Sequence, residues 1–396
     1  MEQNRSSGRL PHAGRPEGTD MVPQISNVVV LMKENHTYDN YFGMLEVGDG
    51  FTLGKDGLPL NSNPDKEGKP VRAHHLSLPF NPPLGLSQTW DSSHRQWNGG
   101  AMDGFVTTTA SHAPMGYLDG NDLPWYYGVA RTFGIGDRYF ASCLAQTFPN
   151  RRFVQAGTAY GLVSTTLPSP FAKPPPTGLI WHHLDRNHVG WANYFAEVPE
   201  VGLWPRNLLH YHDHLHPMEE FFADCHRGSL PPVSLITTEF LVASEGETQD
   251  DQIGEAFTAK VAEAVMNGPQ WPHSMLVIVF DEGGGFYDHV PPPPAVPPDD
   301  VPPDIRVPPD QPGGYDRYGF RVPCLVLSPY SKPGHVSSVV YDHTSILATI
   351  EHKWNLPALT RRDAAAAPLW DFLDLESPPR FLTPPPLPRP VIEPFD

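Results

Sequence analysis

Two pairs of oxygen-bearing side chains follow apolar runs that lie far apart in the chain. Glu34 and Asn35 come shortly after the run at residues 25–32, and Asp281 and Glu282 follow residues 275–280 directly. Carboxylate and amide oxygens are the ligands that hard divalent cations prefer. Polar residues at the end of a strand are common, so one pair alone is weak support for function. If the two pairs meet, they form a cation site.

The elements that position these pairs are predicted from apolar patterning. Residues 25–32 and 275–280 are almost continuously apolar and rich in branched side chains, as in strands buried on both faces. A third run of this kind covers residues 322–327, and residues 255–267 have the spacing of an amphipathic helix. This order predicts a mostly parallel sheet with helices on both faces. Ligands of such sheets bind outside the carboxyl ends of the strands, where both pairs would lie.

Composition narrows the class of protein. The 396 residues carry a formal net charge of −18, which argues against a nucleic-acid interface, because such interfaces depend on clustered Lys and Arg. An acidic chain that handles phosphate needs a local positive element, which a metal ion or some of the 19 histidines would supply. The three cysteines, Cys143, Cys225 and Cys324, predict no disulfide framework.

The chain is expected to form one elaborated domain at residues 25–376, between a disordered N-terminal extension at residues 1–24 and a Pro-rich tail at residues 377–396. Residues 53–85 and 291–312 are predicted loops. The second loop follows Asp281 and is either a wall over the site or an ordinary solvated excursion, the commoner case.

No signal peptide or membrane-spanning segment is visible in the sequence. A soluble, cytoplasmic protein is therefore expected, and secretion is an alternative if a leader was removed.

Five blocks, in order, resemble the bacterial phospholipase C and acid phosphatase family. Residues 34–43 read ENHTYDNYFG, close to the family's opening Glu-Asn-Arg-Ser-Phe-Asp-x-Tyr-Phe-Gly. The other blocks are WNGGAMDGF at 97–105 after His94, TFPNR at 147–151, DEGGGFYDHVPP at 281–292, and a closing pattern from GFRVP at 319 to DHTSIL at 342–347. Five ordered blocks are far more specific than a single motif.

The resemblance implies a three-layer, alkaline-phosphatase-like α/β/α sandwich that hydrolyses phosphate esters. It further implies that Thr147 is the nucleophile, forming a phosphothreonine intermediate, and that Glu34, Asn35, Asp281 and Glu282 hold one or more divalent cations (Mg²⁺, Ca²⁺, Mn²⁺ or Zn²⁺). A threonine hydroxyl is almost wholly protonated at neutral pH, so it needs such a cation. The remaining roles implied are phosphate contacts from Asn35 and Arg151, and leaving-group protonation or phosphate contacts from His94, His289 and His343.

This chain departs from the family pattern at three places where family members carry a histidine. Gly283 follows the paired acids, the stretch around Gly246 replaces Glu-His-Pro-Pro, and Gln88 precedes Trp90. These losses put the substrate in doubt more than the reaction. The main hypothesis is therefore a phospholipase C-type phosphodiesterase acting on a phosphate ester, possibly a phospholipid, with at most peripheral membrane contact. An acid-phosphatase-type monoesterase and a degenerate phosphate-ester-binding relative are the alternatives.

The histidines of residues 210–216, HYHDHLH, are a separate feature. Their alternation would align them on one face of a strand as a zinc site, but exposed polar histidines are the favoured interpretation.

Overall fold

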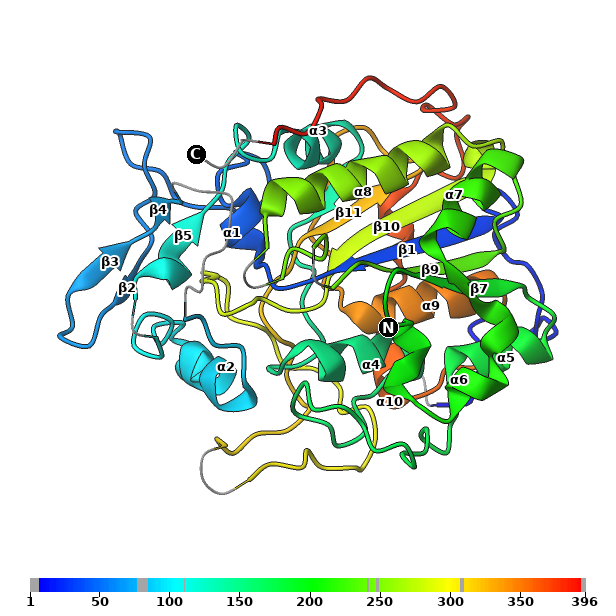
Figure 1. Ribbon diagram of the computed structural model, residues 1–396, viewed down its shortest axis with the longest axis horizontal. Coiled ribbons are helices and arrows are strands. Elements are labelled where there is room, and N and C mark those ends of the chain that lie inside the picture. Colours follow the sequence, from blue (N-terminus) through cyan, green and yellow to red (C-terminus); the bar gives the residue numbers. More distant parts are fainter. Residues whose placement is uncertain are drawn as a thin grey trace.

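An eight-stranded sheet forms the centre of the computed structural model (Figure 1), which describes residues 7–76, 85–109, 111–240, 242–246, 249–306 and 310–392. Seven strands run in one direction, and only β11 runs against its two neighbours. In sheet order the strands are β12 (His335–Ser337), β6 (Gly134–Gly136), β11 (Cys324–Leu327), β10 (Ser274–Phe280), β1 (Asn27–Lys33), β9 (Val233–Thr237), β7 (Trp191–Phe195) and β8 (Leu215–Pro217). The predicted mostly parallel sheet is confirmed.

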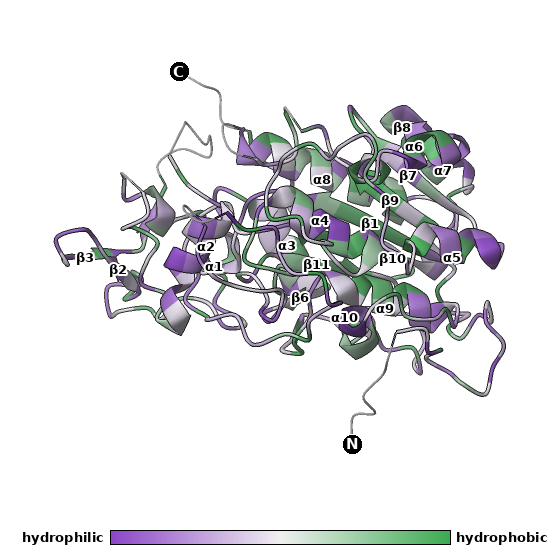
Figure 2. Ribbon diagram, turned by 90° about the horizontal axis from the view of Figure 1, so that it is seen from below, coloured by the Kyte–Doolittle hydropathy of each residue, from purple (hydrophilic) through white to green (hydrophobic). Residues whose placement is uncertain are grey.

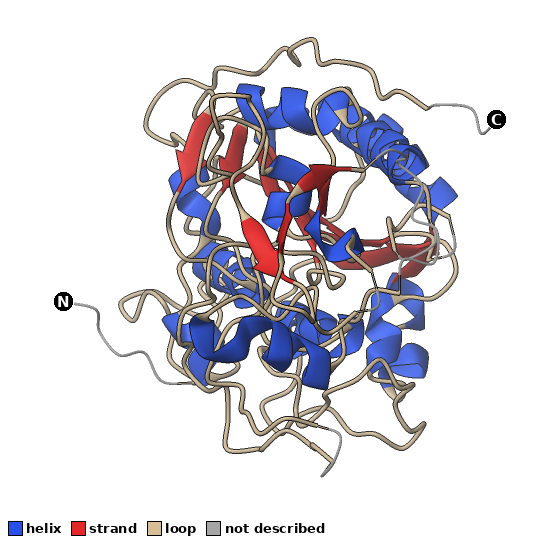
Figure 3. Cartoon of the chain, turned by 90° about the vertical axis from the view of Figure 1, so that its left-hand side faces the viewer, coloured by secondary structure: helices blue, strands red, loops and turns tan. Residues whose placement is uncertain are grey.

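Helices cover both faces of this sheet, so the three-layer sandwich is also confirmed (Figures 1 and 3). One layer contains α3 (Pro124–Thr132), α7 (Met218–Arg227) and α8 (Asp251–Met266). The other contains α4 (Thr147–Ala156), α5 (Ile180–Arg186), α6 (Asn207–His210), α9 (His343–Lys353) and α10 (Arg361–Ala365). The central strands are hydrophobic between more polar outer helices, as Figure 2 shows. Burial of these apolar side chains is the main stabilising contribution.

Register places the predicted ligands side by side. β1 lies between β10 and β9 and is parallel to both, with Lys33 opposite Phe280 at the end of the β1–β10 ladder. The next residues along the two strands are Glu34 and Asp281. The two pairs predicted from the sequence therefore leave neighbouring strands at the same edge of the sheet, as the positional rule for parallel sheets requires.

Beyond this edge lie α1 (Tyr38–Phe42) and a smaller region with α2 (Trp90–Trp97), β2 (Ser62–Pro64), β3 (Pro70–Arg72), β4 (His74–His75) and β5 (Gly116–Tyr117), at the left of Figure 1. Residues 53–76, predicted as loop, thus contain three short strands, and residues 77–84 lie outside the described part. The Pro-rich residues 291–306 and 310–312 form no helix or strand longer than an isolated bridge.

The described part of the predicted N-terminal extension is not disordered, which corrects that prediction for residues 7–24. Gly8 N donates to Ala358 O at 2.8 Å, and Met21 N donates to Lys353 O at 2.7 Å. The Asn355 side chain also donates to three backbone carbonyls of residues 12–16. Polar composition suggested disorder, but these backbone groups find partners on the domain.

The C-terminal tail runs along the surface as far as it is described. Phe381 N donates to Pro329 O at 3.1 Å, and Trp271 Nε1 donates to Phe381 O at 2.7 Å. Within the described residues, no helix combines the length and the apolar character needed to cross a bilayer.

Candidate active site

The ends of β1 and β10 are tied together by backbone and side-chain hydrogen bonds. Asp281 N donates to Lys33 O at 3.1 Å, and Asn35 N donates to Asp281 Oδ1 at 3.3 Å. Asn35 adopts the left-handed backbone conformation with φ of 67°, which asparagine tolerates better than most residues. This sharp turn directs the chain out of the strand immediately after Glu34. It brings the backbone amide of Asn35 against the Asp281 carboxylate.

Arg151 lies at the centre of the acidic residues and is only 1% exposed. Its Nε donates to Asp281 Oδ2 at 2.8 Å, and its Nη1 donates to Glu200 Oε2 at 2.8 Å. Its Nη2 lies 3.4 Å from Glu34 Oε1 and 3.2 Å from Lys33 O. All three guanidinium nitrogens therefore have protein partners, and Arg151 acts as the counter-charge of the cluster.

Glu200 is a member of this cluster that the sequence analysis missed. It begins the short 3₁₀ helix η3 (Glu200–Leu203) and is 3% exposed. Glu200 N donates to Thr237 Oγ1 at 3.3 Å, at the end of β9, and Gln155 on α4 donates to Glu200 O at 2.8 Å. An acid in an irregular segment, without periodicity or a motif, gives no signal in the sequence. Only the fold brings it to Arg151.

Two observations indicate that this cluster suits a divalent cation. Glu282 Oε1, Glu200 Oε1 and Asn35 Oδ1 are buried, and the described residues provide none of them with a hydrogen-bond partner. Three carboxylates also pair with the one guanidinium of Arg151, and Glu282 adds a fourth acid nearby. Burial and the nearby charge of Asp281 raise the pKa of Glu34 to about 7 despite Arg151, and they raise that of Glu282 well above its ordinary value. Unpartnered hard oxygens with surplus negative charge are what a divalent cation binds.

Thr147 is the first residue of α4 and is 6% exposed. Arg151 follows one helical turn later, so the two side chains share a face of the helix. The Asn150 side chain fixes the preceding turn: its Oδ1 accepts from Cys143 N at 3.0 Å and its Nδ2 donates to Ala145 O at 2.8 Å. The hydroxyl of Thr147 therefore lies at the positive end of a helix, on the face that carries Arg151 to the carboxylates.

His343 is the predicted site histidine that contacts the cluster. It begins α9 and is fully buried, and its Nε2 forms a 2.7 Å hydrogen bond with Asp281 O. Its Nδ1 lies 3.3 Å from the Tyr139 hydroxyl. Burial lowers the pKa of His343, which favours the neutral ring. With both nitrogens engaged, the ring holds the backbone of Asp281 in place.

His94 lies in a different environment on α2. Its Nδ1 forms a 2.8 Å hydrogen bond with Trp90 O, and its ring packs at a tilt against the Trp90 indole, with ring centroids 4.3 Å apart. It lines a cavity of about 800 Å³ together with Asp91, Trp97 and Pro312. The residues that line this cavity include neither Thr147 nor the four predicted cation ligands.

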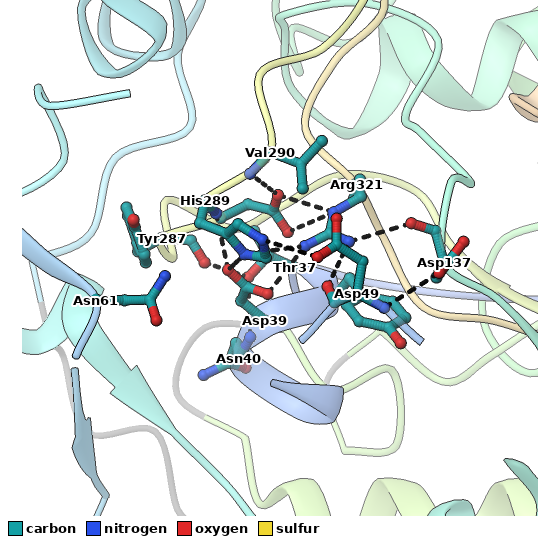
Figure 4. A network of polar contacts seen from close by, with 12 residues as sticks. Thr37, Asp39, Asn40, Asp49, Asn61, Asp137, Tyr287, His289, Val290 and Arg321 are labelled. Carbon is teal, nitrogen blue, oxygen red and sulfur yellow. Dashed lines mark hydrogen bonds and ion pairs between the residues drawn. The ribbon is translucent and has the colours of Figure 1, made fainter. Parts of the chain in front are cut away.

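His289 belongs to a second buried ionic network, shown in Figure 4. Arg321 donates to Asp39 Oδ1 and to Asp288 Oδ1, both at 2.9 Å, and His289 Nδ1 lies 2.7 Å from Asp39 Oδ2. Asp39, Asp288 and His289 bring ligand atoms within 4.8 Å of one another. Arg321 and His289 both pair with these acids, so less negative charge is left unbalanced here than around Arg151. It joins α1 to the loop after β10.

This network predicts a specific pH dependence of stability. Burial alone would lower the pKa of His289, but the hydrogen bond to Asp39 and its charge outweigh burial and raise the pKa from 6.5 to about 9. The resulting stabilisation is complete below pH 6.5 and is lost as pH rises through 9, with a limit of about 3 kcal/mol. We expect urea unfolding from pH 6.5 to 9 to show this loss in the wild type and a flatter profile in His289→Gln.

The exposed His212, replaced by Gln, is the matched control and should keep the wild-type profile. Identical pH profiles of the wild type and His289→Gln would contradict the expectation.

Fold and cluster together define an α/β protein with a buried acidic cluster at the carboxyl edge of its sheet. The chain belongs to the Phosphoesterase family, whose model matches residues 25–357. This confirms the resemblance predicted from the five blocks and makes the chain a phosphoric ester hydrolase.

Several curated proteins are similar over most of their length. Non-specific phospholipase C1 of Arabidopsis thaliana is 30% identical over 92% of this chain and 74% of its own. Phospholipase C B of Mycobacterium tuberculosis is 30% identical over 90% of this chain and 78% of its own. Among solved structures, a protein in the alkaline phosphatase superfamily from Vibrio parahaemolyticus matches 92% of this chain and 72% of its own, with 8% identity and a TM-score of 0.42. The family assignment does not depend on that structural likeness.

Two of the positions where this chain departs from the family pattern adjoin the cluster. A Cβ atom at Gly246 would lie 2.9 Å from Glu34 Oε2, and one at Gly283 would lie 2.8 Å from the methyl group of Thr37. Side chains therefore do not fit at these positions unless their neighbours shift. The methyl of Thr37 occupies space that a residue at 283 would need, while its hydroxyl donates to Tyr287 O at 2.8 Å.

Neither of the other sequence features joins this cluster. Gln88 is partly buried, and its carbonyl accepts a 3.3 Å hydrogen bond from Ser93 Oγ. The histidines of residues 210–216 do not share a strand, because His210 ends α6 and His212 and His214 lie in the short 3₁₀ helix η4 (His212–His214). All four are exposed or half-exposed, in keeping with the favoured interpretation.

Proposed function

We propose that the chain is a metal-dependent phosphodiesterase of the phospholipase C type, in which Thr147 attacks phosphorus and forms a phosphothreonine intermediate. The observation that carries this proposal is the set of buried, unpartnered oxygens at the strand ends, beside the helix that presents Thr147. Glu34, Asn35, Asp281 and Glu282 would hold the cation. The names of the relatives support a phospholipid or a related phosphodiester as the substrate.

The chemistry assigned to the residues follows from their positions. A divalent cation, when bound, supplies the charge that stabilises a threonine alkoxide and the phosphoryl oxygens. Thr147 Oγ gives up its hydroxyl proton and forms a bond to phosphorus while the bond to the leaving oxygen breaks, and one proton passes to that leaving oxygen. Water then hydrolyses the phosphothreonine. The positive end of α4 faces the phosphoryl group in both steps.

The supporting residues divide into two groups. Arg151 and His343 have protein partners at each guanidinium or ring nitrogen, so we assign them to holding Asp281 and its neighbours, with phosphate contacts left to Asn35. His94 protonates the leaving group if the substrate extends from the cluster to the cavity beside α2. His289, engaged by Asp39 and Asp49, receives no step.

Metal-stripped protein tests this proposal directly. We expect no hydrolysis of bis-p-nitrophenyl phosphate or phosphatidylcholine until Mg²⁺, Ca²⁺, Mn²⁺ or Zn²⁺ is restored, because a threonine hydroxyl is too weak a nucleophile without a cation. The same titration with p-nitrophenyl phosphate compares monoester with diester, and circular dichroism checks that stripping leaves the fold intact. A preference for the monoester would indicate a phosphatase. No turnover with any cation would indicate a binding protein.

A further inference from the structure

Residues 243–246 cross the end of β1 in a strained backbone conformation. Glu245 is fully buried, and its φ of 69° lies in the left-handed region that residues with a Cβ atom rarely adopt. Such a conformation costs about 1–3 kcal/mol and persists only where the surroundings fix it. Glu245 therefore has partners strong enough to offset this cost.

Three side chains from three elements hold the Glu245 carboxylate. Lys33 Nζ of β1 lies 2.9 Å from Oε1, and the hydroxyl of Tyr126 on α3 donates to the same oxygen at 2.7 Å. The hydroxyl of Tyr41 on α1 donates to Oε2 at 2.8 Å. His36 Nε2 also forms a 2.9 Å hydrogen bond with the Glu245 carbonyl. Lys33 further donates to the Ala243 carbonyl. The segment is thus held at Ala243 and at both the backbone and the side chain of Glu245.

The clamped segment presents polar atoms to one oxygen of Glu34. Ser244 Oγ donates to Glu34 Oε2 at 3.1 Å, and Ser244 O accepts from Glu34 N at 2.9 Å. Gln249 fixes Ser244 in turn, because its Oε1 accepts from Ser244 N at 2.9 Å and its Nε2 donates to Ser244 Oγ at 2.8 Å. The other oxygen of Glu34 faces Arg151. Each oxygen of this carboxylate is therefore held from a different side.

We propose that Glu245 is a positioning residue for the cation ligand Glu34, acting through Ser244. Its buried carboxylate keeps the strained segment against the end of β1, so that Ser244 fixes the direction of Glu34 Oε2. This inference rests on the proposed function, in which Glu34 binds the cation. Hydrogen bonds from such supporting residues orient metal ligands, and their loss lowers metal affinity by about 10–100-fold.

Calorimetric titration of metal-stripped protein with Mn²⁺ tests the role of Glu245. We expect Glu245→Gln and Ser244→Ala each to weaken Mn²⁺ binding by roughly tenfold or more. The double variant should be no weaker than the weaker single variant, because both changes release the same oxygen. Ser244→Ala keeps every contact of the Glu245 carboxylate, so it tests the inference even if Glu245→Gln fails to fold.

Glu255→Gln is the matched control. Glu255 is a buried carboxylate on α8 that also binds Tyr126, accepting from its backbone N at 2.9 Å, and no hydrogen bond to residues 243–246 is found in the described structure. It should lower the melting temperature and leave Mn²⁺ affinity unchanged. Wild-type Mn²⁺ affinity in Ser244→Ala or in folded Glu245→Gln would overturn the positioning role. Unchanged affinity in Asp281→Asn as well would overturn the cation site itself, and with it the proposed function.

Discussion

Thr147→Ala is expected to lower kcat on phosphodiesters by about a thousandfold or more, because loss of a nucleophile removes the covalent route entirely. The side chain is small, buried to 94% and at the first position of α4, so the substitution removes a hydroxyl and a methyl without breaking the helix. Thr147→Ser keeps a hydroxyl in the same place and should retain measurable turnover. Steady-state kinetics at saturating cation distinguishes the two variants.

The intermediate gives a second readout for the same residue. Acid quenching of wild-type protein during turnover should trap phosphate on the peptide that contains Thr147, as seen by mass spectrometry. Melting temperatures within a few degrees of wild type would show that the variants are folded. A Thr147→Ala protein that keeps a tenth of wild-type kcat would rule out this residue as the nucleophile.

Arg151→Met is expected to destabilise the metal-free protein by about 3–5 kcal/mol, because removal of one partner leaves buried carboxylates without their counter-charge. Glu200, Asp281 and Glu34 all lose an ion pair at once. A bound cation replaces that charge. Saturating Mn²⁺ should therefore restore more stability to Arg151→Met than it adds to the wild type, as measured by urea unfolding with chelator and then with Mn²⁺.

Arg321→Met is the matched control for this experiment. Arg321 is equally buried and pairs with Asp39 and Asp288 in the second network, away from the unpartnered oxygens. Its loss should destabilise the protein to a similar extent, and Mn²⁺ should add only what it adds to the wild type. Equal gains in the two arginine variants would show that Arg151 and the cation do not share the same carboxylates.

The sheet and the meeting of the two oxygen-bearing pairs at its edge were predictable because their signals are local. β1 and β10 each contain an uninterrupted apolar run, and the acids and amides that follow mark their carboxyl ends. The reversed direction of β11 was not predictable, since strand direction depends on how the connecting segment returns to the sheet. The contacts of residues 7–24 with the domain could not be predicted either, because backbone hydrogen bonds to residues 353–358 leave no pattern in the sequence of a polar segment.

The candidate site likewise contains residues that the sequence indicates and residues that only the folded structure reveals. The family blocks predict Arg151 and His343 as site residues with substrate contacts. Their hydrogen bonds to Asp281 instead support the proposal that both hold this residue in place. Glu200 and Glu245 could be recognised only in the folded structure, because each pairs with a residue that is distant in the sequence. A motif can indicate that a residue matters, whereas its role depends on the groups that surround it.

The parallel pairing of β1 with β9 and β10 also constrains how the protein is made. During synthesis β1 leaves the ribosome first, and its two partners follow only when residues 233–237 and 274–280 have emerged. Until then this apolar strand has no partner strand and its two faces, which are buried in the folded protein, are exposed. Such exposed apolar strands can aggregate. The proposed cation site, built from the residues that follow the carboxyl ends of β1 and β10, forms only when most of the domain has been translated.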